Sequence, residues 1–499
     1  MPHAPHPILG RDQWWNSTRT TELHPLRLER PRTLADLERV VNEARALELR
    51  VRAVGRGHSS SDAPFTEDVL VDTARLDRIA AYPAARTPGP YVEVEAGVRV
   101  RDLNTALDRM GLSIRAMGGY NGQSVVGAIL TGTHGSSMDY GALSRMVRSL
   151  VLVVADGPTA HAIRIEPSAG FSDPARLPAN GPLLLQDDEA FHSAVVSMGA
   201  LGLVHSMVLE AEPTYFLKEV RRVSDWTRTK EELRNGLLDR YSGVFVQINP
   251  YEAPGRETTL VMTHERVAAI DRARRLREDV RFGIGWLNNA MRNPLLLLAG
   301  HFRFTYRLLV WRLNRHPDRI GRLLRSAIRG QRDKGYTQTA HRVLYQGAAH
   351  LKLRAYDTEN ALPLRPAPGG EHYLDVVDGL LDMLRELHAR HGFHLSSPVG
   401  LRFVRRSAHW LTPEHERDVC YVDAPVLRDA YGNSNCVGRV QQYLKKHGAI
   451  PHWGKRNEVF DHAHIRRCYP RFDAWARQRD RFDPERRFAN AFTERLLGP

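Results

Sequence analysis

A chain of 499 residues with 42% hydrophobic residues exceeds what a single hydrophobic core usually supports, so we expect two or three domains. Three cysteines without CxxC spacing support neither a disulfide framework nor a zinc cluster, and no metal is expected. The net charge is +14, but residues 272–354 alone hold 19 basic and four acidic residues, so the excess positive charge lies in this one segment. This distribution excludes a protein whose whole surface is basic and binds nucleic acid.

The first part of the chain alternates between helix and strand patterns. Residues 33–48 place apolar side chains at helical spacing behind Thr33, a capping residue, and predict an amphipathic helix. Strands are predicted at 51–54, 69–72, 92–95 and 150–154. We expect residues 19–215 to form one compact domain behind an N-terminal extension at 1–18.

The extension lacks the basic and apolar regions of a secretory signal, so a cytoplasmic location is expected, with membrane association left open. Residues 280–330 mix apolar side chains with arginines and predict basic helices, but the arginines interrupt the stretch of ~20 apolar residues that a membrane span requires. Three interpretations stay open for these helices. They can pack on a domain with solvated arginines, contact anionic lipid peripherally, or cover an apolar substrate tunnel.

A first glycine loop, Gly55–Ser61 with the sequence GRGHSSS, follows a predicted strand. Successive backbone N–H groups of such a loop can face an anion, and glycines permit close approach, which suits a pyrophosphate. The loop lacks the Gly-Lys-Ser/Thr ending of nucleoside-triphosphate loops and the third glycine of the GxGxxG motif.

A second glycine-rich stretch covers residues 118–127 and 131–137 and holds six glycines within 18 residues. A wall laid along a flat cofactor needs backbone without side chains, whereas a packed surface loop has little use for that density. Together the two stretches predict an extended nucleotide cofactor.

Several ordered motifs then carry a family resemblance: VRAVGRGHSSSD, GGYNGQSVVGAILTGTHGSS, SMGALGLVHSMVLE, PHWGK and the closing FDP with FAN. They resemble the vanillyl-alcohol-oxidase superfamily of FAD-linked oxidoreductases, especially its alditol, gulonolactone and D-arabinono-1,4-lactone oxidases. The resemblance implies an α+β fold. A two-part FAD-binding domain would be followed by a mixed α/β substrate (cap) domain at 216–445 and by a segment at 446–499 that completes the active site.

The resemblance also implies FAD as the cofactor, attached covalently to His58, because a neutral imidazole can add to the flavin methyl group. A histidine that only caps the loop beside noncovalent FAD is the alternative. The implied cofactor-binding residues are Val54, Gly55, Arg56, Gly57, His58, Ser59, Ser60, Gly118, Gly119, Gln123, Ser124, Gly127, Thr131, Gly132, His134, Gly135, Val204 and Asn490.

The implied catalytic residues are Arg402, on a strand with an ExR motif in the resembling enzymes, and Lys455, on their HWxK motif. Gly400 occupies the place of the ExR glutamate, which would bind substrate hydroxyls. Either Glu359 replaces that glutamate in catalysis, or the substrate is bulkier and more apolar than a sugar.

The predicted function is oxidation of a CH–OH group of a small organic molecule, with hydride transfer to FAD and O₂ as the electron acceptor. A dehydrogenase or an oxidative cyclase on the same scaffold is the alternative within enzymes. A basic protein that binds membrane or nucleic acid through residues 272–354 is the alternative from another class, although nucleic acid is not an expected partner.

Overall fold

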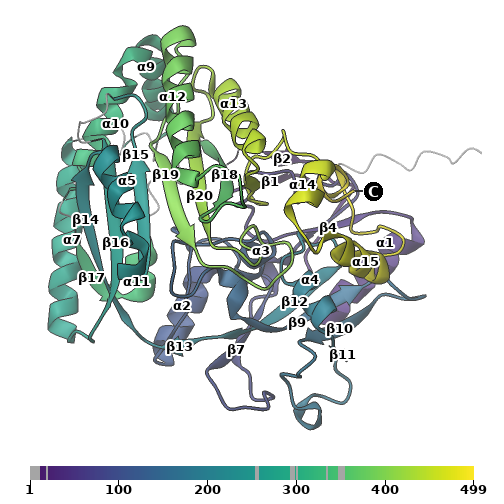
Figure 1. The fold of residues 1–499 in the computed structure, drawn as a ribbon. Coiled ribbons are helices and arrows are strands. Elements are labelled where there is room, and N and C mark those ends of the chain that lie inside the picture. Colours follow the sequence, from purple (N-terminus) through teal and green to yellow (C-terminus); the bar gives the residue numbers. More distant parts are fainter. Residues whose placement is uncertain are drawn as a thin grey trace, which may run out of the picture.

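The computed structural model describes residues 12–17, 19, 21–252, 258–292, 298, 302–332, 335–346 and 354–498. Most of the predicted N-terminal extension therefore lies outside the described residues. The chain forms two sheet-based units, with the purple-to-blue N-terminal part below and the teal-to-green part above it (Figure 1).

The N-terminal unit is built on two larger sheets. The predicted helix is confirmed as α1 (Leu34–Ala46), whose capping box pairs Thr33 with Asp36. A parallel sheet has the order β3 (Arg27–Glu29), β5 (Val69–Asp72) and β4 (Val51–Val54). A mixed sheet has the order β11 (Leu183–Gln186), β10 (His161–Glu166), β9 (Val147–Val154), β12 (Leu203–Glu210), β7 (Tyr91–Glu95) and β6 (Ile79–Ala81). The four predicted strands are confirmed in β4, β5, β7 and β9.

Short elements complete this unit. Its further helices are α2 (Val100–Arg109), α3 (Val125–Leu130) and α4 (Asp188–Ala194). Two-stranded pairs join β1 (Trp14–Trp15) to β2 (Glu22–Leu23), and β8 (Leu112–Ser113) to β13 (Glu212–Pro213). Helix α3 lies inside the second glycine-rich stretch, so residues 118–124 precede the helix and residues 131–137 follow it.

The second unit is an eight-stranded antiparallel sheet. Its order is β17 (Tyr336–Thr339), β14 (Phe216–Ser224), β16 (Thr259–Val267), β15 (Gly243–Ile248), β19 (Val399–Val404), β20 (Val419–Leu427), β18 (Ala355–Pro363) and β21 (Ile450–Pro451). Its helices are α5 (Trp226–Arg234), α6 (Leu237–Arg240), α7 (Arg272–Arg292), α9 (Arg303–Arg315), α10 (Ile320–Arg329), α11 (Ala340–Leu344), α12 (Tyr373–His391) and α13 (Asn433–Lys446).

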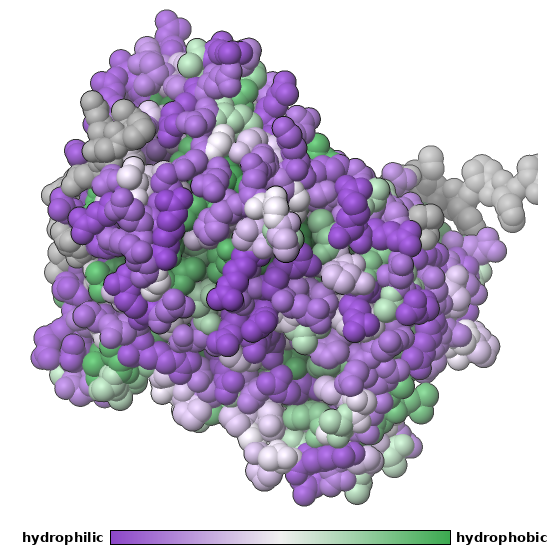
Figure 2. Space-filling model, viewed as in Figure 1, coloured by the Kyte–Doolittle hydropathy of each residue, from purple (hydrophilic) through white to green (hydrophobic). Residues whose placement is uncertain are grey.

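Most of the described part of residues 280–330 is helical, in α7, α9 and α10, as predicted, whereas residues 336–339 of the basic segment 272–354 form the strand β17. Helix α9 packs on α10 through a buried cluster that includes Tyr306, Leu313 and Leu324. Among the residues searched, no helix is long and apolar enough to cross a membrane. The view in Figure 2 is predominantly hydrophilic, with apolar residues in small patches.

The C-terminal helices return to the N-terminal unit. They are α14 (His462–Cys468), α15 (Phe472–Phe482) and α16 (Ala491–Leu497). Their buried aromatic residues, among them Trp475 and Phe492, belong to the same hydrophobic cluster as β9 and β12. The strand β21, just before these helices, pairs with β18 of the second unit. Residues 446–499 therefore bridge the two units.

Candidate active site

A cavity of about 610 Å³ lies between the two units. Both glycine-rich stretches line one side of it, and β15, β18, β19 and β20 line another. The loop after β21 reaches it with His452 and Lys455. Segments from four distant parts of the sequence thus surround one space, which is large enough for an organic ligand.

The glycine loops leave no room for side chains. A Cβ atom on Gly55 would lie 1.9 Å from Oγ of Ser124, so the first loop touches the start of α3. Gly57 has a φ of +62°, and a Cβ atom there would lie 2.6 Å from the ring of Trp14. Glycine at these two positions therefore lets the first loop pack closely against α3 and Trp14 while it lines the cavity.

His58, the middle residue of the first loop, lines this cavity. Its ring lies 4.5 Å from the ring of Tyr120, centroid to centroid, and its Nδ1 lies 3.4 Å from Oγ of Ser17. The next residues are fixed from the other side, because the N–H of Ser60 donates to the carbonyl of Gly454 at 2.9 Å. The His58 loop and the Lys455 loop are therefore held together.

A buried arginine, Arg52, joins three separate segments of the chain just beside the first loop. The guanidinium of Arg52 donates to the carbonyls of Ala63, Met198 and Phe488 at 2.6–2.7 Å. Burial lowers its pKa to about 10, so it stays charged. Arg52 was not predicted from the sequence, although an arginine inside a predicted buried strand was a usable signal.

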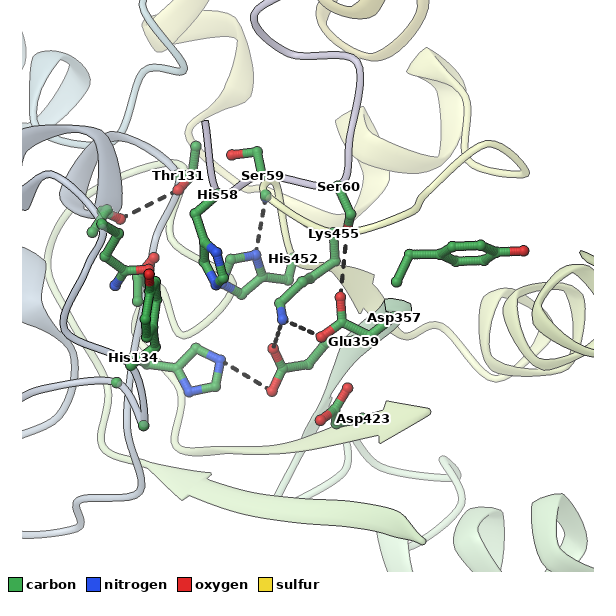
Figure 3. A pocket seen from close by; sticks show the side chains of 18 of the residues that line it. His58, Ser59, Ser60, Thr131, His134, Asp357, Glu359, Asp423, His452 and Lys455 are labelled. Atoms are coloured by element: carbon green, nitrogen blue, oxygen red, sulfur yellow. Dashed lines mark hydrogen bonds and ion pairs between the residues drawn. The ribbon is translucent and has the colours of Figure 1, made fainter. Parts of the chain in front are cut away.

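Five ionisable side chains meet on the side of the cavity lined by the second unit and the Lys455 loop, and Figure 3 labels four of them. Lys455 pairs with Asp357, which also accepts a hydrogen bond from Ser60 at 3.3 Å. Glu359 Oε2 lies 3.9 Å from Lys455 Nζ, and its Oε1 lies 4.0 Å from Nε of Arg402. Asp423, also labelled in Figure 3, is the fifth member. Asp357 and Asp423 were not predicted from the sequence.

Burial and charge set the protonation states of this cluster. Burial opposes ionisation of Glu359, but at the acid pH where Glu359 titrates protonated His134, together with Lys455 and Arg402, outweighs burial and lowers the Glu359 pKa to about 2. Burial likewise disfavours charge on Lys455, but Asp357 and Glu359 overcome that effect and raise its pKa. Glu359 is therefore an anion and Lys455 a cation near neutral pH.

Two buried histidines adjoin the cluster, and both are neutral. Burial lowers the pKa of His134 to about 4 and that of His452 to about 3. Nδ1 of His134 donates to the carbonyl of Gly135 at 2.9 Å, so its Nε2 is an acceptor, 3.6 Å from Glu359 Oε1. Both of these acceptor atoms are buried and lack a donor among the described residues. A ligand hydroxyl would supply one.

These histidines and Glu359 also bring three potential metal-ligand atoms within 4.8 Å of one another. A cation does not fit there well. His452 Nδ1 accepts from the N–H of Gly454 at 3.0 Å, which places the ring proton on Nε2. Arg402 and Lys455 would repel the ion, so the donor set suits a polar organic group.

Most residues predicted from the sequence line this cavity. Arg402, Lys455 and Glu359 do so, as do Val54, the loop residues 55–60, Gly118, Gly119, Gln123, Ser124, Gly127, Thr131, His134 and Val204. Gly132, Gly135 and Asn490 do not line it. Asn490 instead donates to the carbonyls of Asp62, Ala63 and Phe65, and so fixes the chain just after the first glycine loop.

Comparison with protein families finds two matches along the chain. Residues 25–162 match an FAD binding domain, and residues 259–496 match a D-arabinono-1,4-lactone oxidase family. Both matched segments contribute residues to the cavity.

Individual relatives match over nearly the whole length. The chain is 26% identical to L-gulono-1,4-lactone dehydrogenase of Mycobacterium tuberculosis, over 95% of this chain and 96% of that protein. It is 23% identical to L-gulonolactone oxidase of Mus musculus, over 97% and 98% of the two chains. The crystal structure of cholesterol oxidase from Brevibacterium sterolicum superposes with a TM-score of 0.71 at 14% identity, covering all of both chains, which shows a shared fold.

Proposed function

Because the chain belongs to the vanillyl-alcohol-oxidase superfamily and is an FAD-dependent oxidoreductase that acts on a CH–OH group, we propose that FAD is attached to His58 and that Lys455 and Arg402 hold the reacting hydroxyl. The observation that carries this proposal is the single cavity shared by the glycine loops, His58 and the Lys455–Glu359–Arg402 cluster. The predicted cofactor, FAD, is confirmed by the FAD-binding-domain match.

The residues present fit FAD. Gly55, Gly57, Gly118 and Gly127 line the cavity without side chains, which permits the close approach of a pyrophosphate, and no acidic side chain belongs to residues 55–61. His58, in the middle of this loop, lines the same cavity as the ionisable cluster. Bound FAD would supply the two-electron acceptor that alcohol oxidation needs, which none of the side chains here can supply.

The charged cluster supplies electrostatic stabilisation. Lys455 keeps its proton because Asp357 and Glu359 raise its pKa, so it cannot be the base that takes the hydroxyl proton. Together with Arg402 it instead places positive charge where the substrate oxygen becomes negative. Both cations are held by anions of β18, which fixes them before a substrate arrives.

The substrate that we propose is bulkier and more apolar than a sugar lactone. The part of the cavity lined by the second unit carries many apolar side chains: Phe245, Met262, Leu323, Leu324, Ala327, Pro425, Val426 and Leu427. Three polar residues there, Arg221, Gln331 and Gln247, hydrogen-bond to one another at 3.1 and 3.4 Å. This wall suits an alcohol with an extended apolar body and few hydroxyls.

The electron acceptor that we propose is O₂, reduced to hydrogen peroxide. The relatives differ in this respect, since the mycobacterial protein is named a dehydrogenase and the mouse protein an oxidase. The test is to reduce the bound flavin anaerobically with an apolar primary alcohol, then admit O₂ and measure peroxide. One peroxide per reoxidised flavin supports the proposal, and flavin that stays reduced in air refutes the choice of acceptor.

We further propose that the outer face of α9 contacts anionic membrane. Phe304, Leu308 and Trp311 recur at spacings of four and three residues, and they are 76%, 40% and 58% exposed. Arg307 and Arg312 lie beside them on the exposed part of the same helix. Exposed aromatic and leucine side chains flanked by arginines are typical of helices that lie in a lipid interface.

The position of α9 connects this surface to the substrate. The inner face of α9 packs on α10, and α10 lines the cavity with Leu323 and Leu324. An apolar alcohol dissolved in a membrane would therefore meet the protein next to the wall that we propose binds it.

A further inference from the structure

The strand that carries Arg402 has no carboxyl group at Gly400, yet a carboxyl group lies directly beside that position. Gly400 of β19 is the Cα partner of Asp423 of β20, and Asp423 is in turn the partner of Glu359 of β18. Side chains of directly opposed residues project from the same face of a sheet. All three residues line the cavity, so the row that they form across β19, β20 and β18 faces the cavity.

Glycine at position 400 leaves the space that Asp423 uses. A Cβ atom on Gly400 would lie 3.4 Å from Cβ of Asp423 and 3.2 Å from the ring of Phe245. These contacts are already tight, so a long side chain on β19 and the carboxyl of Asp423 would compete for the same part of the cavity.

Glu359, the other candidate, already serves as a counter-ion to two cations. Its side chain is 4% exposed and lies between Lys455 and Arg402. Its pKa of about 2 gives it too little affinity for a proton to accept one from a hydroxyl group. The neutral rings of His134 and His452, with pKa values of about 4 and 3, are unsuited for the same reason.

Asp423 differs from these groups in having no cation of its own. Asp357 and Glu359 face it from β18, Arg402 faces it from β19, and Lys455 faces it from the loop after β21. No ion pair joins Asp423 to a described residue within 4.0 Å, and its buried Oδ1 has no hydrogen-bond partner among them. Burial, Glu359 and Asp357 together raise its pKa to about 8.

We propose that Asp423 supplies, from β20, the carboxyl group that β19 lacks at Gly400, and that it binds the reacting hydroxyl of the substrate and accepts its proton. This inference rests on the proposed function. In the reaction, the carbinol C–H bond gives a hydride with its two electrons to FAD, and the O–H bond gives its proton to the Asp423 carboxylate. The product is a carbonyl compound. While the hydride and the proton leave, the positive charges of Lys455 and Arg402 stabilise the negative charge that develops on the reacting oxygen.

The first test compares Asp423→Asn with the wild-type holoenzyme and with Asp429→Asn, a control in an exposed position six residues further along the chain. Reduction of the bound flavin is followed anaerobically from pH 5 to 10, with benzyl alcohol and L-gulono-1,4-lactone as probes. We expect the limiting rate of the wild type and of the control to rise through a step near pH 8. In Asp423→Asn the rate should fall about 100-fold and the step should vanish. An unchanged rate and pH profile in Asp423→Asn overturns the inference.

The second test needs no turnover. The absorption spectrum of the bound flavin is titrated over the same pH range in the same three proteins, and the step near pH 8 should be absent only from Asp423→Asn. A step that persists in that variant contradicts the inference, whereas purified protein without any flavin contradicts the proposed function instead.

A third test moves the carboxyl group from position 423 on β20 to position 400 on β19. Adding Gly400→Glu to Asp423→Ala should recover at least tenfold of the rate lost in Asp423→Ala alone.

Discussion

Nζ of Lys455 lies 3.9 Å from Oε2 of Glu359, and this contact joins the C-terminal segment to β18 of the eight-stranded sheet. The backbone strengthens the link, because the N–H groups of His452 and Arg456 donate to the carbonyls of Glu359 and Asp357 at 2.9 and 3.0 Å. Since Ser60 binds both Gly454 and Asp357, the flavin side of the cavity is tied to the same point. The position of the Lys455 ammonium is thus determined by both units.

Lys455→Ala should leave the flavin bound and slow its reduction by substrate about 100-fold or more, because a fixed positive charge at the reacting oxygen is removed. Lys446→Ala, at an exposed position on α13, is the matched control and should behave as the wild type does. Stopped-flow absorbance of the flavin measures both rates. A Lys455→Ala enzyme that reduces its flavin at the wild-type rate would remove this residue from the mechanism.

Glu359→Gln should lower the free energy of unfolding at pH 7 by about 3 kcal/mol, since it leaves Lys455 and Arg402 without a buried counter-ion. The folded-state pKa of Glu359, about 2, lies below its ordinary value of 4.5. Its stabilising contribution is therefore complete above pH 4.5 and is lost as the pH falls towards 2. Denaturant unfolding should show that the difference in the free energy of unfolding between the wild type and Glu359→Gln narrows below pH 4.5.

The control for that experiment is Glu386→Gln, in an exposed ion pair with Arg390 on α12. Such pairs contribute about 0–1 kcal/mol, so little change is expected at either pH. If the difference in the free energy of unfolding between the wild type and Glu359→Gln stays constant from pH 7 to pH 3, Glu359 does not act as an ionised partner.

Gly57→Ala should reduce flavin occupancy and destabilise the protein by about 1–2 kcal/mol, because alanine is strained at a φ of +62° and its Cβ would meet Trp14. Gly438→Ala is a control for which the opposite effect on stability is expected. Gly438 lies within α13 with open space around its Cβ position, so alanine there should stabilise by about 0.5–1 kcal/mol. The ratio of flavin to protein absorbance measures occupancy, and normal occupancy in Gly57→Ala would argue against close backbone packing at the cofactor.

Replacing Phe304, Leu308 and Trp311 together by serine should weaken binding to vesicles of phosphatidylcholine and phosphatidylglycerol at least tenfold, because three exposed apolar side chains no longer enter the interface. Vesicles of phosphatidylcholine alone should bind the wild type less, since the arginines lose their anionic partners. Leu183→Ser, at an exposed leucine of the other unit, is the control. Cosedimentation that is equal for the triple variant and the wild type would refute the proposed membrane surface.

Local patterns in the sequence predicted those features that depend on neighbouring residues. The capping box of α1, the strands β4 and β5 and the two glycine-rich stretches are all of this kind. Arg402 and Lys455 were found through motifs and indeed line the cavity.

Features that depend on strand register could not be found in this way. Asp423 faces Gly400 only because β19 and β20 pair in one particular register, which no short motif encodes. Asp357 is similar, because its partners Ser60 and Lys455 lie far away in the chain. Asn490 was predicted to bind the cofactor from its motif, but its amide is used by three backbone carbonyls near Ala63.

Covalent attachment of the flavin to His58 can be measured by precipitating the purified protein with acid. We expect the yellow colour to stay in the pellet of the wild type and to move to the supernatant in His58→Ala. Tyr120→Phe, which keeps the ring beside His58, should retain the colour in the pellet. Release of all flavin from the wild-type protein would contradict a covalent bond, and equal retention in His58→Ala would place that bond on another residue.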